Sequence, residues 1–440
     1  MISTIKKELV LVAPLVNPRI YYLLVNLLQR LATQNPVPYS LLALAALTPK
    51  DYSVKIINQK QFWSRRDFKE GALIAITCLT STAPESYRLA DSFRRAGSHV
   101  ILGGPHVTAM PQEASDHADS IVIGEAESVW SSVVGDYERG RLQKIYKGKP
   151  LEDFFAPVYD YFLRLDPNLL VRAGIHIARG CKYHCDFCAR ISKWLRFVKI
   201  EQVIELIKRM KEAHQSFFIR RPFIIFRCDN IYSSPAYAKE LFKKMIALNI
   251  IWSANCSIDI GFDGEALDLA RDSGCERLLI GFEGIYPKDY RKTSLEQFTS
   301  VEDYKIAIRN IKARGIKIFG SFIIGQERYT HKDYLKLLWF LVRAGLWHIF
   351  LLILTPFPGT ELFDRLTKEG RIVSFNWRKY DMLTCVVKPR RVSVVGVYFW
   401  FWLIRGLSCF FSPLPLIGWL AFVASWQAAY HISRWLMFNF

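Results

Sequence analysis

Cysteine is scarce in this chain: nine cysteines are spread over 440 residues without an evenly spaced framework. A secreted domain held by disulfides needs a much higher density, so we expect reduced or metal-bound thiols and a cytoplasmic compartment. Acidic residues are also few, 40 against 59 lysines and arginines, which leaves a formal net charge of +19. This excess of positive charge predicts an anionic partner. Nucleic acid, acidic lipid and a phosphate-bearing substrate are all consistent with that charge.

The first residues resemble a secretory signal only in part. The apolar stretch 9–16 follows Lys6 and Lys7 as in a signal peptide, but it is short, contains Pro14 and leads into an Asn-Pro-Arg turn. A signal peptide would instead end in a small-residue cleavage site. We therefore expect this stretch to be the first strand of a domain.

The chain is longer than a domain with a single compact core usually is, and its length suits two domains with an appendage. Residues 1–145 alternate short apolar runs with helical patterns, and the runs lie at 9–13, 53–57, 72–77, 99–103 and 120–123. This rhythm predicts an α/β domain with a doubly wound parallel sheet. Ligands of such sheets bind beyond the carboxyl ends of the strands. Three loops, at 80–82, 103–106 and 124–127, are therefore expected to face one crevice.

Residues 146–172 have a mixed composition and are interpreted as a linker. A second series occupies residues 173–385, with apolar runs at 174–178, 222–227, 251–255, 276–281, 316–324 and 348–354 between helical patterns. These strand–helix repeats predict a partial (β/α)6 TIM-like barrel, whose active site lies at the C-terminal ends of its strands.

The most specific signal follows the first barrel strand, in the sequence Arg-Gly-Cys-Lys-Tyr-His-Cys-Asp-Phe-Cys at 179–188. Cys181, Cys185 and Cys188 can hold three irons of a four-iron cubane, whereas electron-transfer clusters of this type take four cysteines. No fourth cysteine lies nearby in the sequence, so one iron is left open for a ligand. A zinc site made of the three cysteines and His184 is the alternative, although zinc sites usually pair two short knuckles.

The triplet resembles the motif of the radical S-adenosylmethionine superfamily, including the aromatic residue before the last cysteine, here Phe187. The resemblance implies a 4Fe-4S cluster whose open iron binds S-adenosylmethionine, so that an electron breaks a carbon–sulfur bond and releases a radical. Residues at later strand ends match what the superfamily needs to hold this cofactor. Together with Phe187 of the cysteine motif, the expected set is Asp229, Asn230, Glu283, Ser321 and Gly325. Taken singly these are ordinary strand ends, and Asp229-Asn230 is equally a helix cap or turn.

The N-terminal loops resemble the domain of cobalamin-binding radical S-adenosylmethionine enzymes, and with the triplet the likeness covers residues 8–385. That family includes hopanoid C-methylases and the anaerobic magnesium-protoporphyrin monomethyl ester cyclase. The resemblance implies a cobalamin held by Thr80, Ser81, Thr82, Gly103, Gly104, His106, Gly124 and Glu125.

One departure from the family concerns the lower ligand of cobalt. The cobalamin fold often carries Asp-x-His-x-x-Gly, but residues 55–75 contain no histidine, and Asp116-His117 does not fit that spacing. Backbone and hydroxyl contacts would then hold the corrinoid. His106 either faces the corrin or is a turn histidine bonded to its own surroundings. A domain that kept the fold without the cofactor is a further alternative.

Residues 386–440 form an apolar extension that we expect to be helical and membrane-associated. From Val392 to Ser412 only Arg405 is charged, residues 414–430 carry no charge, and each run approaches the length that a bilayer needs. Basic residues flank the two runs, so a hairpin would keep both ends on the cytoplasmic side. This predicts attachment to the inner face of the membrane through residues 392–432. The alternative is a pair of helices packed over the barrel, which Arg405 favours.

The sequence thus predicts a cobalamin-dependent radical C-methyltransferase for an apolar or lipid-like substrate, with a reductant such as a flavodoxin or ferredoxin. In the implied scheme, one S-adenosylmethionine methylates cobalt and a second yields the radical that removes a substrate hydrogen. The alternatives are a radical oxidoreductase or cyclase without methyl transfer, and a zinc-stabilised membrane or RNA binding protein. Nucleic acid is not expected, because charge is its only signal. Catalytic acid–base residues stay unassigned, since hydrogen abstraction by a radical depends mainly on positioning.

Overall fold

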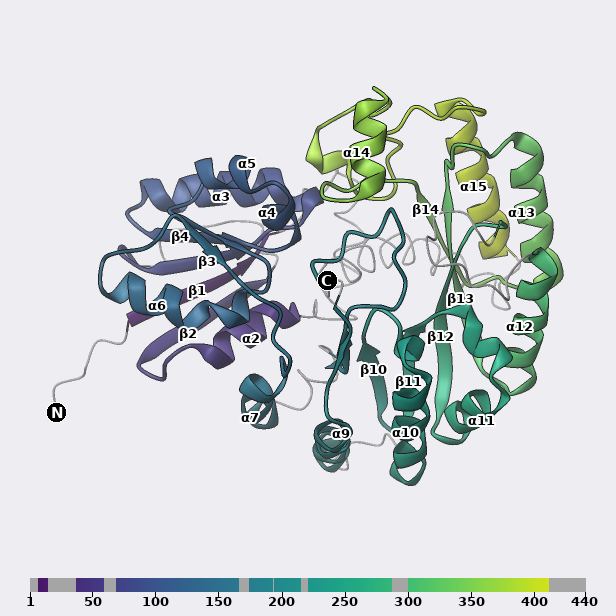
Figure 1. Cartoon of the computed structure of the whole chain (residues 1–440), viewed down its shortest axis with the longest axis horizontal. Coiled ribbons are helices and arrows are strands. Elements are labelled where there is room, and N and C mark those ends of the chain that lie inside the picture. Colours follow the sequence, from purple (N-terminus) through teal and green to yellow (C-terminus); the bar gives the residue numbers. More distant parts are fainter. Residues whose placement is uncertain are drawn as a thin grey trace.

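The computed structural model describes residues 7–14, 37–58, 69–165, 174–192, 194–214, 221–286 and 300–410. Two α/β units lie side by side, the N-terminal unit in purple and blue and the second unit in teal and green (Figure 1). Each unit is built on a parallel sheet of six strands. The two predicted α/β domains are therefore confirmed.

The N-terminal sheet has the strand order β2-β1-β3-β4-β5-β6. Its strands are β1 (Lys7–Ala13), β2 (Tyr52–Asn58), β3 (Leu73–Thr77), β4 (His99–Gly103), β5 (Ser120–Ile123) and β6 (Ile145–Lys147). The last five residues of β1 are all buried, as expected for a central parallel strand that is covered on both faces. Apolar side chains alternate between two cores, one under each layer of helices.

Helices cover both faces of this sheet, which makes it doubly wound. One layer consists of α2 (Tyr39–Leu47) and α6 (Trp130–Glu138), and the other of α3 (Ala83–Arg95), α4 (Pro105–Ala109) and α5 (Pro111–Asp116). Figure 1 shows these two layers above and below the strands. The carboxyl ends of the strands point toward the second unit, so the predicted loops lie between the two units.

The second sheet is an open, partial barrel with the order β14-β13-β12-β11-β10-β7. Its strands are β7 (Ile175–His176), β10 (Phe223–Arg227), β11 (Ile251–Cys256), β12 (Cys275–Glu283), β13 (Lys317–Ile324) and β14 (Ile349–Ile353). The helices between and after them are α9 (Ile200–His214), α10 (Pro235–Met245), α11 (Gly264–Asp272), α12 (Val301–Ala313), α13 (His331–Ala344) and α14 (Glu361–Lys368). This arrangement confirms the predicted partial (β/α)6 barrel.

The predicted linker 146–172 contains more structure than expected. Strand β6 ends within it and pairs with β5 in the N-terminal sheet. Helix α7 (Ala156–Arg164) also lies within it. The composition of this stretch gave no sign of either element, because β6 is short and α7 begins with an Ala-Pro pair that reads as a loop.

The segment after the barrel joins the two units. Side chains from β14 onward, including Phe357, Leu362 and Trp377, share one apolar core with α3–α5 of the N-terminal unit. A short helical turn, η7 (Trp377–Lys379), places the indole N–H of Trp377 2.9 Å from a carboxylate oxygen of Glu113. The barrel's C-terminal segment therefore holds the N-terminal domain over the barrel mouth.

The apolar extension begins with α15 (Val394–Phe410), which packs along the barrel. Val397, Trp400, Phe401 and Ile404 join the barrel core, and Arg405 is only 3% exposed. The described part of the chain contains no helix that is both long and apolar enough to cross a bilayer. The first apolar run is therefore a helix packed on the barrel, which was the alternative to a membrane segment. Residues 411–432 of the predicted membrane segment lie outside the described residues.

Candidate active site

The three-cysteine loop lies at the mouth of the barrel. It follows β8 (Ala178–Arg179), which pairs with β9 (Arg196–Phe197) in a small antiparallel sheet. Gly180 has φ of 84°, and a Cβ there would lie 2.3 Å from the carbonyl oxygen of Trp194, so the turn requires glycine. Beyond it, Cys181, Cys185 and Cys188 line one cavity.

Neighbouring side chains fix the shape of this loop. The guanidinium of Arg190 donates to the carbonyl oxygens of Cys181, at 3.2 Å, and of Tyr183. On the other side, Lys182 Nζ and Tyr183 Oη reach the same Asp259 carboxylate oxygen at 2.6 Å and 2.9 Å. The loop is therefore held in place by Arg190 at its own end and by Asp259 of η6 (Ile258–Phe262).

Most of the residues predicted to hold S-adenosylmethionine line the same cavity as the thiols. They are Phe187, Asp229, Asn230, Glu283 and Ser321. Gly325, the sixth, does not line it, and its N–H donates to Tyr334 Oη at 2.9 Å. The structure thus brings five of the six predicted residues together with the cysteines.

The two members of the Asp229-Asn230 pair have different surroundings. Burial raises the pKa of Asp229 to about 7, against the weaker opposite effect of Arg190, so this carboxyl lacks a full counter-charge. The Asn230 amide is already occupied: Nδ2 donates to Ser257 Oγ at 2.8 Å, and Oδ1 accepts from the N–H groups of Tyr232 and Ser257. Asn230 therefore caps η4 (Ile231–Ser233), which was the alternative left open by the sequence.

Asn255 also lines this cavity and was missed by sequence reasoning. Its Nδ2 donates to the carbonyl of Cys228 at 3.0 Å, whereas its buried Oδ1 has no hydrogen-bond partner among the described residues. A buried oxygen that accepts no hydrogen bond destabilises the folded protein, unless a bound ligand supplies the donor. The signal in the sequence was a single asparagine near the end of an apolar strand.

Backbone strain is concentrated at the same cavity. Glu283 and Met382 have φ of 61° and 58°, a region that residues with a side chain rarely adopt, and both line the cavity. At Glu283 the pairing of β12 with β13 also shifts in register. Strained backbone of this kind is retained where it aims a side chain at a ligand.

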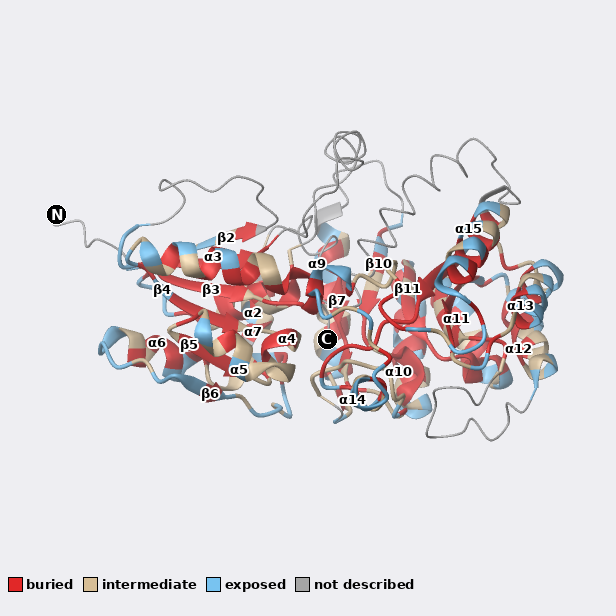
Figure 2. Ribbon diagram, turned by 90° about the horizontal axis from the view of Figure 1, so that it is seen from above, coloured by how far each residue is buried: buried red, intermediate tan, exposed pale blue. Residues whose placement is uncertain are grey.

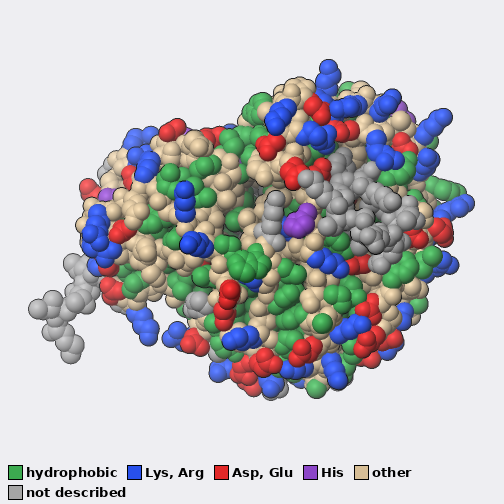
Figure 3. Space-filling view, in the orientation of Figure 1, with side chains coloured by type: hydrophobic (Ala, Val, Ile, Leu, Met, Phe, Trp, Pro, Cys, Tyr) green, Lys and Arg blue, Asp and Glu red, His purple; other side chains and the backbone are tan. Residues whose placement is uncertain are grey.

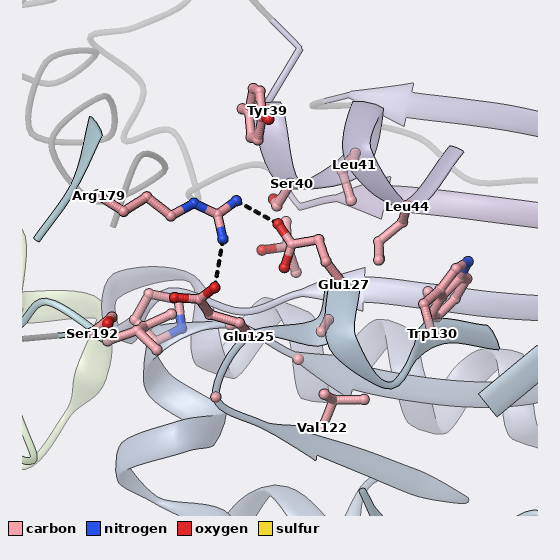
Figure 4. A pocket seen from close by; sticks show the side chains of 18 of the residues that line it. Tyr39, Ser40, Leu41, Leu44, Val122, Glu125, Glu127, Trp130, Arg179 and Ser192 are labelled. Carbon is pink, nitrogen blue, oxygen red and sulfur yellow. Dashed lines mark hydrogen bonds and ion pairs between the residues drawn. The ribbon is translucent and has the colours of Figure 1, made fainter. Parts of the chain in front are cut away.

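A second cavity lies at the carboxyl ends of the N-terminal strands (Figure 4). Gly103, Gly104, Gly124 and Glu125 of the predicted cobalamin set line it. Gly104 has φ of 110°, and a Cβ there would lie 2.8 Å from the carbonyl oxygen of Cys78. One wall is apolar and includes the side chains of Leu41, Leu44, Val122 and Trp130 shown in Figure 4.

The remaining predicted cobalamin residues lie elsewhere. Thr80 lines the barrel cavity instead, while Ser81, Thr82 and His106 line neither cavity. His106 is fully buried, with Nδ1 3.3 Å from Thr80 Oγ1 and Nε2 3.5 Å from Glu113. This is the turn histidine bonded to its own surroundings, the second of the two alternatives. The histidine that lines this cavity is His176, from β7 of the barrel.

A buried ion-pair cluster joins the two units beside the N-terminal cavity. Arg179, two residues before the first cluster cysteine, extends between Glu125 at 2.9 Å and Glu127 at 2.5 Å (Figure 4). Arg196 also pairs with Glu125. Burial alone would raise the pKa of Glu127, but Arg179 outweighs it and the pKa is lowered. The cysteine loop is therefore tied directly to the β5 loop of the N-terminal domain.

The two cavities share a wall. Leu79, Pro105, Arg190 and Asp229 line both of them. Leu79 comes from the loop after β3 and Pro105 from the start of α4. Arg190 lies at the end of the cysteine loop, and Asp229 lies just after β10. A ligand in one cavity would therefore share contacts with a ligand in the other.

Fold and site together define a class: an enzyme with a doubly wound domain over a partial barrel, each carrying a ligand cavity at its strand ends. Residues 175–341 match the family model of the radical SAM superfamily, and residues 37–134 match that of the B12 binding domain. The chain belongs to the radical S-adenosylmethionine enzymes that carry a B12-binding domain. This overturns the alternative of a non-enzymatic zinc protein.

Characterised relatives agree in overall organisation. The bacteriochlorophyllide d C-12(1)-methyltransferase of Chlorobaculum tepidum is 28% identical over 81% of this chain and 79% of that protein. The anaerobic magnesium-protoporphyrin IX monomethyl ester cyclase of Cereibacter sphaeroides is 25% identical over 72% of this chain and 57% of that protein. A radical S-adenosylmethionine methyltransferase from Kitasatospora setae, solved with cobalamin and a [4Fe-4S] cluster, shares the fold, with a TM-score of 0.61 at 17% identity over 82% of this chain and 75% of that one.

The cofactors of the family are a 4Fe-4S cluster, S-adenosylmethionine and cobalamin, and the residues present fit them. Three thiols on one loop suit a cluster with an open iron. The unsatisfied Asn255 Oδ1 and the undercompensated Asp229 carboxyl suit the cationic amino group of S-adenosylmethionine. The glycine-lined loops of the other cavity allow close approach of a large ring.

Proposed function

We propose that this chain is a cobalamin-dependent radical C-methyltransferase that acts on an apolar small molecule. The shared wall between the two cavities is the observation that carries the proposal. Methyl transfer requires a methyl carrier and a substrate radical to lie next to each other. The four residues that line both the N-terminal cavity and the barrel cavity support that arrangement.

Each residue group has a distinct role in this proposal. Cys181, Cys185 and Cys188 hold the cluster, while Asp229 receives the amino group of S-adenosylmethionine and Glu283 its ribose or carboxypropyl group. When bound, the cluster supplies the electron that cleaves S-adenosylmethionine, and cobalamin carries the methyl group. Gly103, Gly104, Gly124 and Glu125 line the cobalamin cavity, and Arg190 holds the cysteine loop against the shared wall.

Part of the lining of the barrel cavity is apolar, which supports an apolar substrate. The side chains concerned are Leu279, Ile323, Leu352, Leu354, Phe357 and Met382. The relatives named above act on bacteriochlorophyllide d and on magnesium-protoporphyrin monomethyl ester. A chlorin-like tetrapyrrole is therefore the substrate class to test first, ahead of the lipid-like molecule that the sequence suggested.

A radical oxidoreductase or cyclase is the second candidate, because one of the relatives is a cyclase. The match to the methyltransferase extends over a larger share of both chains, which favours methyl transfer. The mass of the product separates the two, since methylation adds a fixed mass and ring closure does not. The electron donor in either case is a reductant such as a flavodoxin or ferredoxin.

For its location we propose a cytoplasmic enzyme attached to the inner face of the membrane through residues 392–432. The low density of cysteine supports the compartment, and the low charge of this stretch supports the attachment.

The deciding experiment compares the wild type with Cys185→Ala after anaerobic purification and cluster reconstitution. Formation of 5′-deoxyadenosine from S-adenosylmethionine is measured together with iron, sulfide and cobalt content. Cys275→Ala is the matched control, because Cys275 is buried at the start of β12, at the opposite end of the strand from Glu283. We expect Cys185→Ala to lose iron, sulfide and cleavage, and Cys275→Ala to keep them.

Cleavage that does not depend on Cys185 would contradict the proposed cluster site. Cleavage that depends on Cys185 in a protein that binds no cobalamin would contradict cobalamin-dependent methyl transfer. A product without the added methyl mass would favour the cyclase.

A further inference from the structure

Two neighbouring helices at the edge of the barrel, α13 and α15, expose apolar side chains. In each helix the exposed apolar residues are separated by four and then three positions, which places them on one face of the helix. We define the α13–α15 face as Leu335, Trp339 and Val342 of α13 with Val395, Phe399 and Trp402 of α15. Trp339 is 57% exposed, Phe399 58% and Val395 77%.

The two helices pack side by side, so the face is continuous. Trp400 Nε1 lies 2.9 Å from His331 Nδ1, and the Trp400 ring stacks on Tyr334 of α13. Figures 1 and 2 both show α13 and α15 as neighbours, with buried and exposed sides on α15.

The exposed charged side chains of α13 and α15 are all positive, and one of them, Lys336, lies 3.6 Å from the carboxylate of the buried Asp333. Lys332, Lys336 and Arg343 are exposed on α13, and the Arg343 guanidinium lies 4.9 Å from the centre of the Trp339 ring. Asp333, the one acidic residue of the two helices, is buried and bonded to Thr330. Figure 3 shows lysines and arginines gathered at the upper right of the molecule, over α14 and α13.

We propose that the α13–α15 face docks on an anionic membrane surface. Apolar patches that remain exposed on a folded protein are interaction sites. Tryptophans with neighbouring cations are typical of the interface between lipid headgroups and acyl chains. The chain also leaves this face at Phe410 into residues 411–440, in which Arg434 is the only lysine, arginine, aspartate or glutamate. Helix α15 thus lies along the bilayer surface instead of crossing it.

This inference deepens the proposed location at the membrane and is independent of methyl transfer. Its test uses the full chain and vesicles of either phosphatidylglycerol or phosphatidylcholine, with the bound fraction measured by sedimentation. One variant combines Trp339→Ser, Phe399→Ser and Trp402→Ser, and a second combines Lys336→Glu and Arg343→Glu. Ile246→Ser on η5 (Ile246–Leu248) is the matched control, because Ile246 is 42% exposed and Trp402 43%.

We expect the wild type to bind phosphatidylglycerol vesicles more tightly than phosphatidylcholine vesicles. The triple serine variant should lose about tenfold in partitioning to both, as expected for removal of buried apolar area. The charge variant should lose binding to phosphatidylglycerol alone, and Ile246→Ser should bind as the wild type does. Formation of 5′-deoxyadenosine without vesicles should be equal in all four proteins, which separates this proposal from the proposed reaction and shows that the variants fold.

Two results would overturn the proposal. The first is a wild type that binds neither kind of vesicle. The second is a triple variant that binds vesicles as well as the wild type does: attachment would then lie in residues 411–440 alone, or, if the triple variant also changes from dimer to monomer, the face would be assigned to a second copy of the chain.

Discussion

Individual residues of the site owe their position to backbone features far from the cysteine motif. The spacing of Cys181, Cys185 and Cys188 was visible in the sequence, and so were several polar strand ends. The strained backbone at Glu283 and Met382 was not, because φ depends on how β12 and the segment after β14 are packed. The wall shared by the two cavities likewise combines residues 79 to 229, which no local pattern connects.

Leu79 in this wall provides a test at the residue scale. Because Leu79 is 1% exposed and lines both cavities, Leu79→Phe adds volume at the place where we propose that the methyl group is transferred. We expect cobalamin content and S-adenosylmethionine cleavage to persist, while methylated product per 5′-deoxyadenosine falls by about tenfold or more, since overpacking a tight site displaces its neighbours. Leu79→Met, which nearly conserves volume, is the control. An unchanged product ratio in Leu79→Phe would show that the methyl group does not pass this wall.

Among the elements, α13 shows how local sequence sets a helix boundary. Thr330 and Asp333 form a reciprocal capping box at its start, a pattern visible in the sequence. The structure adds a hydrogen bond from Tyr286 to Asp333. Burial opposes ionisation of this carboxyl, but the bonds from Tyr286 and Thr330 outweigh it and lower its pKa from 3.8 to about 2.

This shift predicts a stability that depends on pH. A carboxyl whose pKa is lowered by folding stabilises the protein above pH 4, and the contribution fades as the pH falls toward 2. Asp333→Asn should therefore lower the free energy of unfolding by about 1–2 kcal/mol at pH 7, and by less at pH 3, in urea titrations. Asp303→Asn, at the same position of the capping box of α12, is the control and should cost less, because Asp303 bonds at the exposed Ser300. Equal losses at both pH values would contradict the assignment.

In the whole molecule, the ion-pair cluster of Arg179, Arg196, Glu125 and Glu127 decides how the N-terminal domain meets the barrel. Arg196 is 5% exposed and also donates to the carbonyl of Leu151. Removing one partner of a buried pair leaves a charge without compensation, which costs about 3–5 kcal/mol. We expect Arg196→Met to lower the melting temperature, to retain less cobalamin and to be cut faster by trypsin between residues 146 and 174.

An exposed ion pair provides the control for this prediction. Arg209 lies 3.6 Å from Glu205 on α9, with 54% of its side chain exposed. Such pairs contribute about 0–1 kcal/mol, so Arg209→Met should leave melting, cobalamin content and proteolysis nearly unchanged. If the two variants behave alike, the buried cluster does not hold the domains together.

The sequence by itself determined the two α/β units, because buried parallel strands need continuous apolar runs and amphipathic helices need a 3.6-residue period. It also determined the cysteine loop, since its ligand spacing is local. Only the tertiary structure decided that His106 and Asn230 are bonded internally, that Asn255 and Met382 line the barrel cavity, and that α15 packs on α13 while exposing an apolar face. These features depend on contacts between segments far apart in the chain. Hydrophobic periodicity predicts that one face of a helix or strand is buried, but it does not predict which segment covers that face.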